Sequence, residues 1–257
     1  MNKGFGINRK EIKKKTLPND IEFTSQTRKA IILAREGKFL ESEKIYKYLI
    51  SRGKYTHITY MQLSGLYEKL GRRKESFNCL QKAVDLKNNY AEAYSEIGRY
   101  LLESGEIKSA LNYFGIALNH NPNLIGPYIN IGNIHQKSGN LKEALKYYKN
   151  SLKIDNKIPL IFYNIGIIYS KEKNFIEAEN NYSSALKCDQ NFTFAKIELL
   201  NIYLNTFNII SLRKLKKFIE KVGLNTDDKI TNLLTFFYLD RSPQKQYLRA
   251  LNFSKKS

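Results

Sequence analysis

Residues able to perform catalysis or bind a metal are few and scattered in this chain of 257 residues. Its histidines, His57, His120 and His135, follow no spacing that would gather them as ligands of one metal ion. The two cysteines, Cys79 and Cys188, form no Cys-x2-Cys motif and lie far apart in the chain. We therefore expect no metal site and no disulfide, and free cysteines favour a reducing, cytoplasmic compartment.

Two other patterns also fall short of a catalytic constellation. Glu92 and Glu96 are four residues apart, which places both on one face of a helix, and a solvated or groove-facing helix surface explains them better than an acid/base pair. Gly4 and Gly6 belong to no phosphate-binding loop, and they lie in a basic leader, residues 1–22, that we expect to be flexible. We expect the chain to be no enzyme and to need no cofactor and no small-molecule substrate.

The chain is strongly basic, with a formal net charge of +19. Most of the positive charge comes from lysine, with 33 residues against 10 arginines, whereas nucleic-acid sites favour arginine and stacking aromatics. Basic residues are densest after residue 206, for example on one predicted helix between Arg213 and Lys221. A solvated capping helix explains this segment most simply, and contact with nucleic acid or an anionic membrane is the less favoured alternative.

A pattern of small and aromatic residues returns every 34 residues and organises the chain. Gly98, Gly132 and Gly166 each follow an isoleucine. An alanine follows each glycine after twelve residues and an aromatic after sixteen, which gives Ala110, Ala144 and Ala178, then Phe114, Tyr148 and Tyr182. Two further steps back along the chain keep the register, so it covers five units. A fixed period of this length predicts stacked supersecondary units.

Each unit has the pattern of two amphipathic helices. Apolar residues recur at offsets of three and four, as at Tyr94, Ile97 and Leu101, and give each helix one buried stripe. The glycines between the two helices suit the positive φ that ends a helix: Gly37, Gly71, Gly105 and Gly139. Because one helix pair cannot bury its stripe alone, neighbours must stack, and we predict an all-α, right-handed α-solenoid.

These residues resemble a known family. The period, the run of Phe162, Ile165, Gly166 and Tyr169, and the later Ala178, Tyr182 and Ala185 are similar to the tetratricopeptide repeat (TPR). The resemblance implies a TPR superhelix with five repeats, at 23–56, 57–90, 91–124, 125–158 and 159–192. A sixth unit, 193–226, has leucines where small residues belong and is interpreted as a degenerate terminal repeat. Residues 227–257 are predicted to form a capping helix, at 228–240, and a basic tail.

The resemblance also implies a concave groove, lined by the first helix of each repeat, in which a protein or peptide partner binds. The candidate site is formed by residues at groove-lining positions: Gln62, Glu96, Arg99, Asn130, Asn133, Lys137, Tyr163, Asn164, Lys171 and Asn201. Amides prevail in the middle of this set, and an amide can both donate to and accept from the backbone of an extended peptide. The alternative is that these asparagines only reflect the wet surface of a chain rich in asparagine.

Two TPR subfamilies offer a comparison. TPRs that bind chaperone C-termini share a clamp of lysine, asparagine and arginine, and this chain has Ser95, Arg99 and Leu160 at three of its positions, which disfavours chaperone-tail binding. The TPR arms of O-linked glycosyltransferases carry an asparagine ladder, of which Asn130 and Asn164 match two rungs. The opening of the leader is also similar to TPR proteins of marine cyanobacteria.

The sequence therefore predicts a scaffold that binds a protein or peptide partner in its groove. Two alternatives stay open at this point. One is a non-catalytic recognition subunit of a separate glycosyl- or other group transferase. The other is a basic adaptor on nucleic acid or on a membrane surface.

Overall fold

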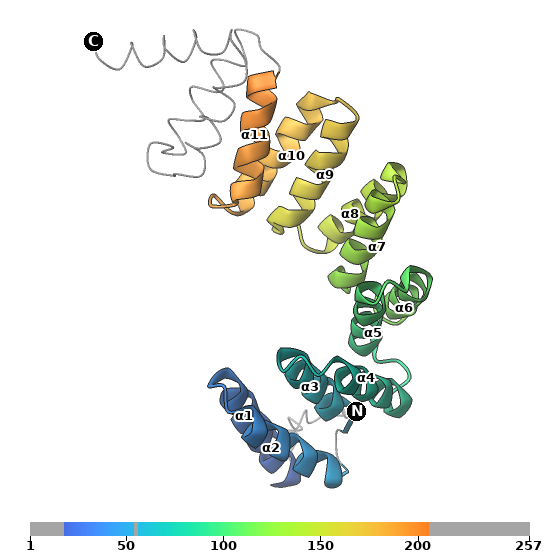
Figure 1. Cartoon of the computed structure of the whole chain (residues 1–257), viewed down its shortest axis with the longest axis vertical. Helices are drawn as coiled ribbons and strands as arrows, with labels where there is room; N and C mark the ends of the chain where they lie inside the picture. Colours follow the sequence, from blue (N-terminus) through green and yellow to red (C-terminus); the bar gives the residue numbers. More distant parts are fainter. Residues whose placement is uncertain (1–17, 54–55, 206–257) are drawn as a thin grey trace, which may run out of the picture. The chain divides into compact units, whose positions relative to one another are not determined.

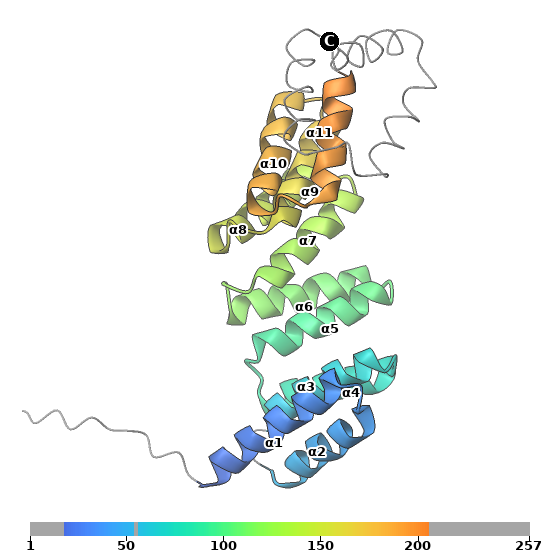
Figure 2. The same cartoon turned by 90° about the vertical axis from the view of Figure 1, so that its left-hand side faces the viewer.

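The computed structural model describes residues 18–53 and 56–205, and these residues form helices without any strand. The helices are α1 (Pro18–Arg35), α2 (Phe39–Ser51), α3 (Thr56–Lys69), α4 (Arg73–Leu86), α5 (Ala91–Glu103), α6 (Ile107–His120), α7 (Ile125–Lys137), α8 (Leu141–Ile154), α9 (Pro159–Lys171), α10 (Phe175–Cys188) and α11 (Thr193–Asn205). Consecutive helices lie side by side as pairs (Figures 1 and 2). This arrangement confirms the predicted all-α helical-repeat solenoid.

Several predicted segments lie at or beyond the ends of the described chain. Helix α1 begins at Pro18, within the segment that the sequence assigns to the leader. Helix α11 provides the first helix of the sixth repeat. The second helix of that repeat, the predicted capping helix at 228–240 and the basic tail lie outside the described residues.

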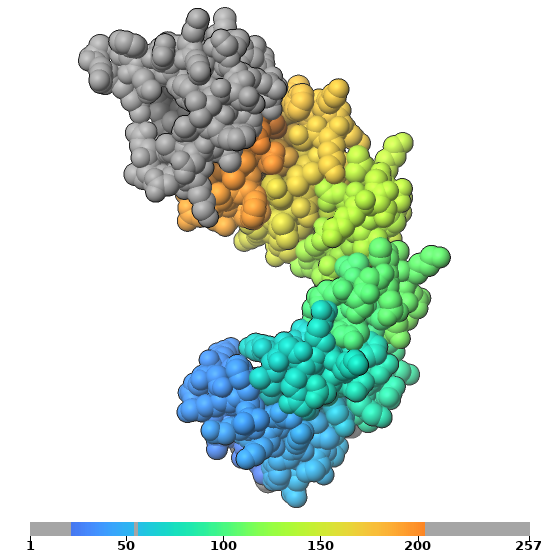
Figure 3. Space-filling model, viewed as in Figure 1, coloured from blue at the N-terminus to red at the C-terminus, as the bar shows by residue number. Residues whose placement is uncertain are grey.

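The chain divides into two compact units at the junction of Ile131 and Gly132, inside α7. We call the described residues up to 131 unit 1 and those from 132 to 205 unit 2. In unit 1, the side chains of α1 to α4 pack into one continuous mass, blue to cyan in Figure 3. In unit 2, the side chains of α9, α10 and α11 do the same, yellow to orange in the same view.

The small residues of the repeat bring the two helices of a pair into contact, as the sequence predicts. A methyl group built on Gly98 would lie 2.7 Å from the ring of Phe114. The same group on Gly132 would lie 2.6 Å from Tyr148, and on Gly166 it would lie 2.5 Å from Tyr182. These separations are too short for real carbon atoms, so only glycine fits against the aromatic ring of its own repeat.

The turn between the paired helices uses a left-handed residue in every described repeat. Gly37, Gly71, Gly105 and Gly139 have φ between +70° and +84°, as predicted for residues that end a helix. The fifth repeat has Lys173 at this position, with φ +59°. The backbone geometry is therefore kept even where the glycine is lost, at the expense of strain in a residue with a Cβ atom.

Turns between successive repeats form both with and without the proline that usually marks them in TPRs, which this chain keeps only as Pro122. Asn121, Asp155 and Asp189 follow the second helices of three repeats, and each accepts a hydrogen bond from the backbone N–H two residues later, at 2.8 to 3.0 Å. This Asx turn lets a side chain fix the chain direction locally. It explains why the repeat tolerates Asn156 and Gln190 one residue further on.

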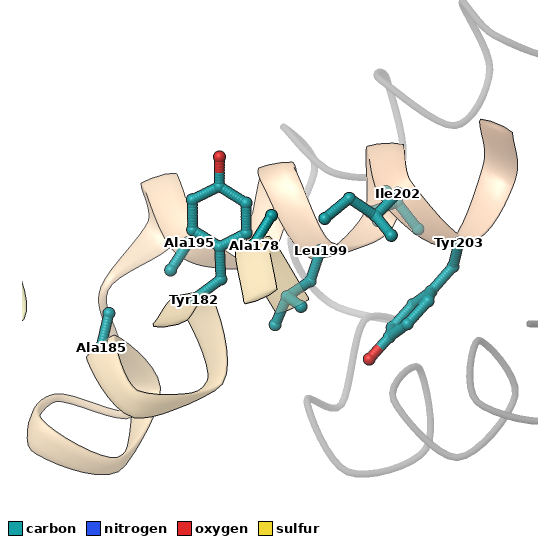
Figure 4. Close-up of a cluster of buried hydrophobic side chains, with 8 residues drawn as sticks. Ala178, Tyr182, Ala185, Ala195, Leu199, Ile202 and Tyr203 are labelled. Carbon is teal, nitrogen blue, oxygen red and sulfur yellow. The ribbon is translucent and has the colours of Figure 1, made fainter. Parts of the chain in front are cut away.

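The aromatic residue of the fifth repeat lies in the core that joins α10 to α11. Tyr182 is fully buried among Ala178, Ala195 and Leu199, as Figure 4 shows. Leu200, which replaces the small residue expected at this point of the sixth repeat, is also fully buried. The sixth repeat therefore begins by packing α11 on the fifth in the ordinary way.

Candidate partner-binding face

All ten residues of the predicted site lie on first helices of the repeats. Gln62 is on α3, and Glu96 and Arg99 are on α5. The others are on α7, α9 and α11: Asn130, Asn133, Lys137, Tyr163, Asn164, Lys171 and Asn201. Contact of these residues with a partner in a groove stays a prediction.

In unit 2, the buried hydroxyl of Tyr148 meets two amides of α7. Its oxygen lies 2.6 Å from Asn133 Oδ1 and 2.7 Å from Gln136 Oε1. A hydroxyl has one proton, so it donates to one of these oxygens at a time. Burial raises the pKa of Tyr148 above its usual range, which keeps this donor protonated.

Asn133 also joins α7 to α9. Its Oδ1 accepts a hydrogen bond of 3.2 Å from Asn164 Nδ2. Asn164 is only 9% exposed, and this hydrogen bond satisfies its Nδ2 inside the protein. The pair still has Asn133 Nδ2 as a donor and Asn164 Oδ1 as an acceptor without a partner among the described residues. One free donor beside one free acceptor is the complement of a peptide unit.

The equivalent tyrosine one repeat later has no such partners. Ile167 and Ser170 replace the two amides that face Tyr148, and the buried hydroxyl of Tyr182 forms no hydrogen bond of good geometry in the described chain, although Ser170 lies close enough to lower its pKa slightly. Burial, with a contribution from Glu198, raises the pKa of Tyr182 above its usual range. The asparagine ladder is therefore a local feature of α7 and α9 rather than a property of every repeat.

Aromatic side chains gather beside these amides, between α9 and α11. Tyr163 lies 5.6 Å from Phe192 and 5.8 Å from Phe194, measured between ring centroids, and the two phenylalanine rings are 5.8 Å apart. Phe194 is 61% exposed although it is a large apolar residue. We call Leu160, Tyr163, Phe192 and Phe194 the aromatic corner. Leu160 lies one helical turn before Tyr163 on α9 and is 43% exposed.

Lysines stand at the other end of the same helices. Lys137 and Lys171 occupy equivalent positions, one repeat apart, in the last turns of α7 and α9. Both side chains are exposed, and neither forms an ion pair with any residue that the structure describes. Cations in the last turn of a helix are also favoured by the helix dipole, which accounts for part of their presence.

Unit 1 has ions where unit 2 has amides. Arg99, the equivalent of Asn133, contacts Glu68, Glu96 at 2.8 Å and Glu103 at 2.6 Å. Arg73 contacts Glu103 as well. These groups therefore satisfy one another across α3, α4 and α5, and little hydrogen-bonding capacity is left over on the guanidinium.

The remaining candidates are not brought together. Gln62 Oε1 and Asn201 Oδ1 are both buried without a hydrogen-bond partner among the described residues. Asn130 is half-buried on α7. The predicted site includes Tyr163 of the aromatic corner but not Phe192 or Phe194, although Phe194 stands one repeat after Leu160 and the repeat register would have placed these two side by side.

The described residues contain no metal-binding cluster and no helix suited to span a membrane. They contain no group of three or more histidine, cysteine or acidic side chains that could hold a metal ion. Among the helices in this part of the chain, none combines the length and the apolar character needed to span a bilayer. Cys79 and Cys188 are free thiols in the structure.

Comparison with known families agrees with the repeat register. Family models described as tetratricopeptide repeat match residues 58–90, 127–157 and 160–192. These segments coincide with the second, fourth and fifth predicted repeats to within two residues. The chain is a TPR protein, and TPR repeats form scaffolds for interactions between proteins.

Solved structures share the fold at low sequence identity. PilF of Pseudomonas aeruginosa is 13% identical, with a TM-score of 0.68, over 91% of this chain and 99% of PilF. The C-terminal part of a TPR repeat-containing protein of Cytophaga hutchinsonii is 16% identical, with a TM-score of 0.65, over 81% of this chain and 84% of that one. YrrB, described as a TPR protein with an unusual peptide-binding site, is 20% identical, with a TM-score of 0.51, over 66% of this chain and 88% of YrrB. No curated protein matches the sequence.

Proposed function

We propose that the chain is a non-catalytic scaffold that binds an extended peptide segment of a partner protein on the first helices of unit 2. The observation that carries this proposal is the hydrogen-bonded pair of Asn133 and Asn164, joined at 3.2 Å. Each amide keeps one unused polar atom, and together they can accept and donate to the backbone of a single peptide unit.

The comparison with unit 1 supports the choice of unit 2. The guanidinium of Arg99 donates to three carboxylates of its own chain, so a ligand at this position would have to displace existing ion pairs. Asn133 and Asn164 need no such displacement. The peptide-binding site in the description of YrrB, a protein of similar fold, makes a peptide a reasonable ligand class for this chain.

The two alternatives from the sequence lead to different expectations. A transferase recognition subunit would also use the asparagines, so it differs from our proposal only in the identity of the partner. A basic adaptor would instead depend on Lys214, Lys216 and Lys217, which lie outside the described residues. No contact of the described residues favours this second alternative.

Binding can be tested with a library of random decapeptides displayed on phage and selected on the full chain. Enriched peptides are then labelled with a fluorophore, and their affinity is measured by fluorescence anisotropy. Replacing Asn130, Asn133 and Asn164 by alanine should weaken binding at least tenfold, because each lost hydrogen bond to the peptide contributes about 0.5–1.5 kcal/mol. The helical content measured by circular dichroism should stay unchanged.

Matched controls separate binding from folding. Asn112, Asn119 and Asn180 are exposed asparagines on second helices, and changing all three to alanine should leave the affinity unaltered. Asn133→Ala also removes one of the two acceptors of the buried Tyr148 hydroxyl. Making the triple change in a Tyr148→Phe background removes this hydroxyl, so any loss of binding is then not caused by its lost hydrogen bond. If the first triple variant binds normally and neutralising the three lysines abolishes binding, the basic adaptor replaces our proposal. Binding that survives both sets of changes contradicts both.

A further inference from the structure

The first helices of unit 2 have apolar residues at one end and basic residues at the other. A peptide that contacts both ends must therefore carry groups that match each of them. The aromatic corner lies at the N-terminal ends of α9 and α11. The exposed amines of Lys137 and Lys171 lie at the C-terminal ends of α7 and α9, with the pair of Asn133 and Asn164 between the two ends.

We propose that the segment bound by unit 2 carries a bulky apolar side chain and an acidic group about five residues apart. The apolar side chain would pack on the aromatic corner, and the acidic group would pair with Lys137 and Lys171. This inference rests on the proposed function, since it describes the peptide that the same face binds.

Exposure supports the apolar end of this assignment. Phe194 is 61% exposed and Leu160 is 43% exposed, and they occupy equivalent positions in neighbouring repeats of unit 2. The rings of Tyr163 and Phe192 adjoin Phe194, which makes a continuous apolar surface with a hydroxyl at one point. Aromatic side chains of this kind anchor interfaces because they bury much area with little loss of conformational entropy. At the corresponding positions of unit 1 stand Ile58, the charged Glu92 and Gly126.

Charge complementarity supports the acidic end. Lys137 and Lys171 form no ion pair within the described chain, whereas Glu103, at the same position of the third repeat, contacts both Arg73 and Arg99. Two exposed amines at one edge would attract a carboxylate or a C-terminus. Glu198 lies on the middle of the same face, where burial raises the pKa of Tyr163 and Tyr182 and the charge of Glu198 adds to the rise. It would repel an acidic side chain near the aromatic corner and so favours one orientation of the peptide.

The helix sets the spacing. Leu160 and Lys171 are eleven residues apart on α9, which corresponds to about 16 Å at 1.5 Å per residue. An extended peptide covers about 3.3 Å per residue, so about five residues connect the two ends. The two asparagines would then contact the backbone between the anchors.

The selection from random decapeptides tests this composition directly on the full chain. We expect the enriched peptides to share one leucine, isoleucine, phenylalanine or methionine and one aspartate or glutamate, four to six positions apart. Phe194→Ser should reduce their affinity at least tenfold, whereas Ile176→Ser, at a 75% exposed residue on α10, should not change it.

Charge reversal gives a second, independent readout. The double variant Lys137→Glu, Lys171→Glu should bind the acidic peptides at least tenfold more weakly than the unchanged chain does. It should bind the same peptides more tightly when lysine replaces their acidic residue. Lys149→Glu with Lys187→Glu, on exposed sites of α8 and α10, is the matched control.

The outcomes separate this inference from the proposed function. One outcome is that the enriched peptides need Asn133 and Asn164 for binding and yet share neither the apolar nor the acidic residue. That result would overturn the inference and leave the proposed function standing. An absence of any peptide that depends on the asparagines would overturn both. If sedimentation velocity shows that the chain dimerises alone and that Phe194→Ser abolishes the dimer, a second copy is the occupant and the inference is wrong.

Discussion

The two units of the chain use one repeat register for different chemistry. Arg99 in unit 1 and Asn133 in unit 2 are equivalent residues, yet Arg99 is bound by three glutamates and Asn133 by a tyrosine and another asparagine. The residues that contact within a helix pair, such as Gly98 with Phe114 and Gly132 with Tyr148, are nearly the same. The comparison shows that the buried positions of the repeat define the fold, while residues such as Arg99 and Asn133 on the first helices differ between the units.

Buried charge separates the units as well. Glu43 in unit 1 is 6% exposed and contacts Lys47, Tyr67 and Arg72 at 2.8 to 2.9 Å. In the described part of unit 2, the buried polar residues are the uncharged Ser151 and Asn164. Unit 1 therefore depends on ionic contacts that respond to pH, and unit 2 depends on neutral hydrogen bonds.

The largest expected effect concerns the contact that both units share. Gly132→Leu should destabilise the chain by about 3 kcal/mol, near the upper end of the range for overpacked cores, because even a methyl group there meets the ring of Tyr148. Gly98→Leu in unit 1 should behave alike, and Lys142→Leu at an exposed site should be nearly silent. Urea unfolding monitored by circular dichroism measures all three. Equal stabilities for the Gly132 and Lys142 variants would contradict the repeat register.

The next effect should distinguish unit 1 by its response to pH. Lys47, as the main cause, together with Tyr67 and Arg72, holds the pKa of Glu43 below its ordinary value of 4.5. The unfolded chain therefore binds a proton at Glu43 more readily than the folded chain, so this stabilisation is present above about pH 4.5 and is lost as the pH falls through the lower folded pKa. Glu43→Gln should destabilise unit 1 by about 1–2 kcal/mol at pH 7.

Hydrogen exchange of α2 and α3 at several pH values measures this difference locally. The gap between the wild type and Glu43→Gln should narrow as the pH falls below 4.5. A gap that stays constant over this range would show that the charge of Glu43 contributes nothing to stability. Exchange in α9 and α10 of unit 2 serves as the internal control.

A smaller effect concerns the hydroxyl groups of unit 2. Tyr148→Phe removes a buried donor that lies within 2.7 Å of two amide oxygens, and it should destabilise the chain by about 1 kcal/mol. Tyr182→Phe should be neutral or slightly stabilising, since it removes a buried hydroxyl without a partner. Thermal unfolding of the two variants gives the comparison. A larger loss from Tyr182→Phe would mean that its hydroxyl has an unrecognised role.

The smallest effect concerns the turn of the fifth repeat. Lys173→Gly should stabilise unit 2 by about 0.5 kcal/mol, because glycine relieves the left-handed backbone at φ +59° while it adds freedom to the unfolded chain. Gly105→Lys, the reverse change in unit 1, should destabilise by a similar amount. Urea midpoints of the two variants measure the difference, and a destabilised Lys173→Gly variant would show that the lysine side chain itself supports the turn.

Much of this fold could be predicted from the sequence, because it rests on short-range patterns. The spacing of Gly132 and Tyr148 encodes a contact within one helix pair, and the turn glycines encode local backbone geometry. The site could be predicted only in part. Asn133 and Asn164 were placed correctly on first helices, but their mutual hydrogen bond and the role of Asn133 as acceptor for Tyr148 depend on side-chain orientation. Sequence spacing does not determine that orientation.

Lys173 and the Asx turns show a second reason for incomplete prediction. Several residue types can produce one backbone geometry, so a turn persists when its usual glycine or proline is absent. Phe192 and Phe194 of the aromatic corner were missed for another reason. Phe192 and Phe194 come from the degenerate sixth repeat, where an unusual residue could equally be a packing substitution or a surface feature.

The most direct test of the central claim is a nuclear magnetic resonance titration of the ¹⁵N-labelled full chain with an enriched peptide. We predict that the resonances of the side-chain amides of Asn133 and Asn164, and of the backbone amides of α9 and α11, shift most. The backbone around Arg99 in unit 1 should stay unchanged. Shifts concentrated on Arg99 and its glutamates, or on the second helices α8 and α10, would contradict the claim that the first helices of unit 2 bind the peptide.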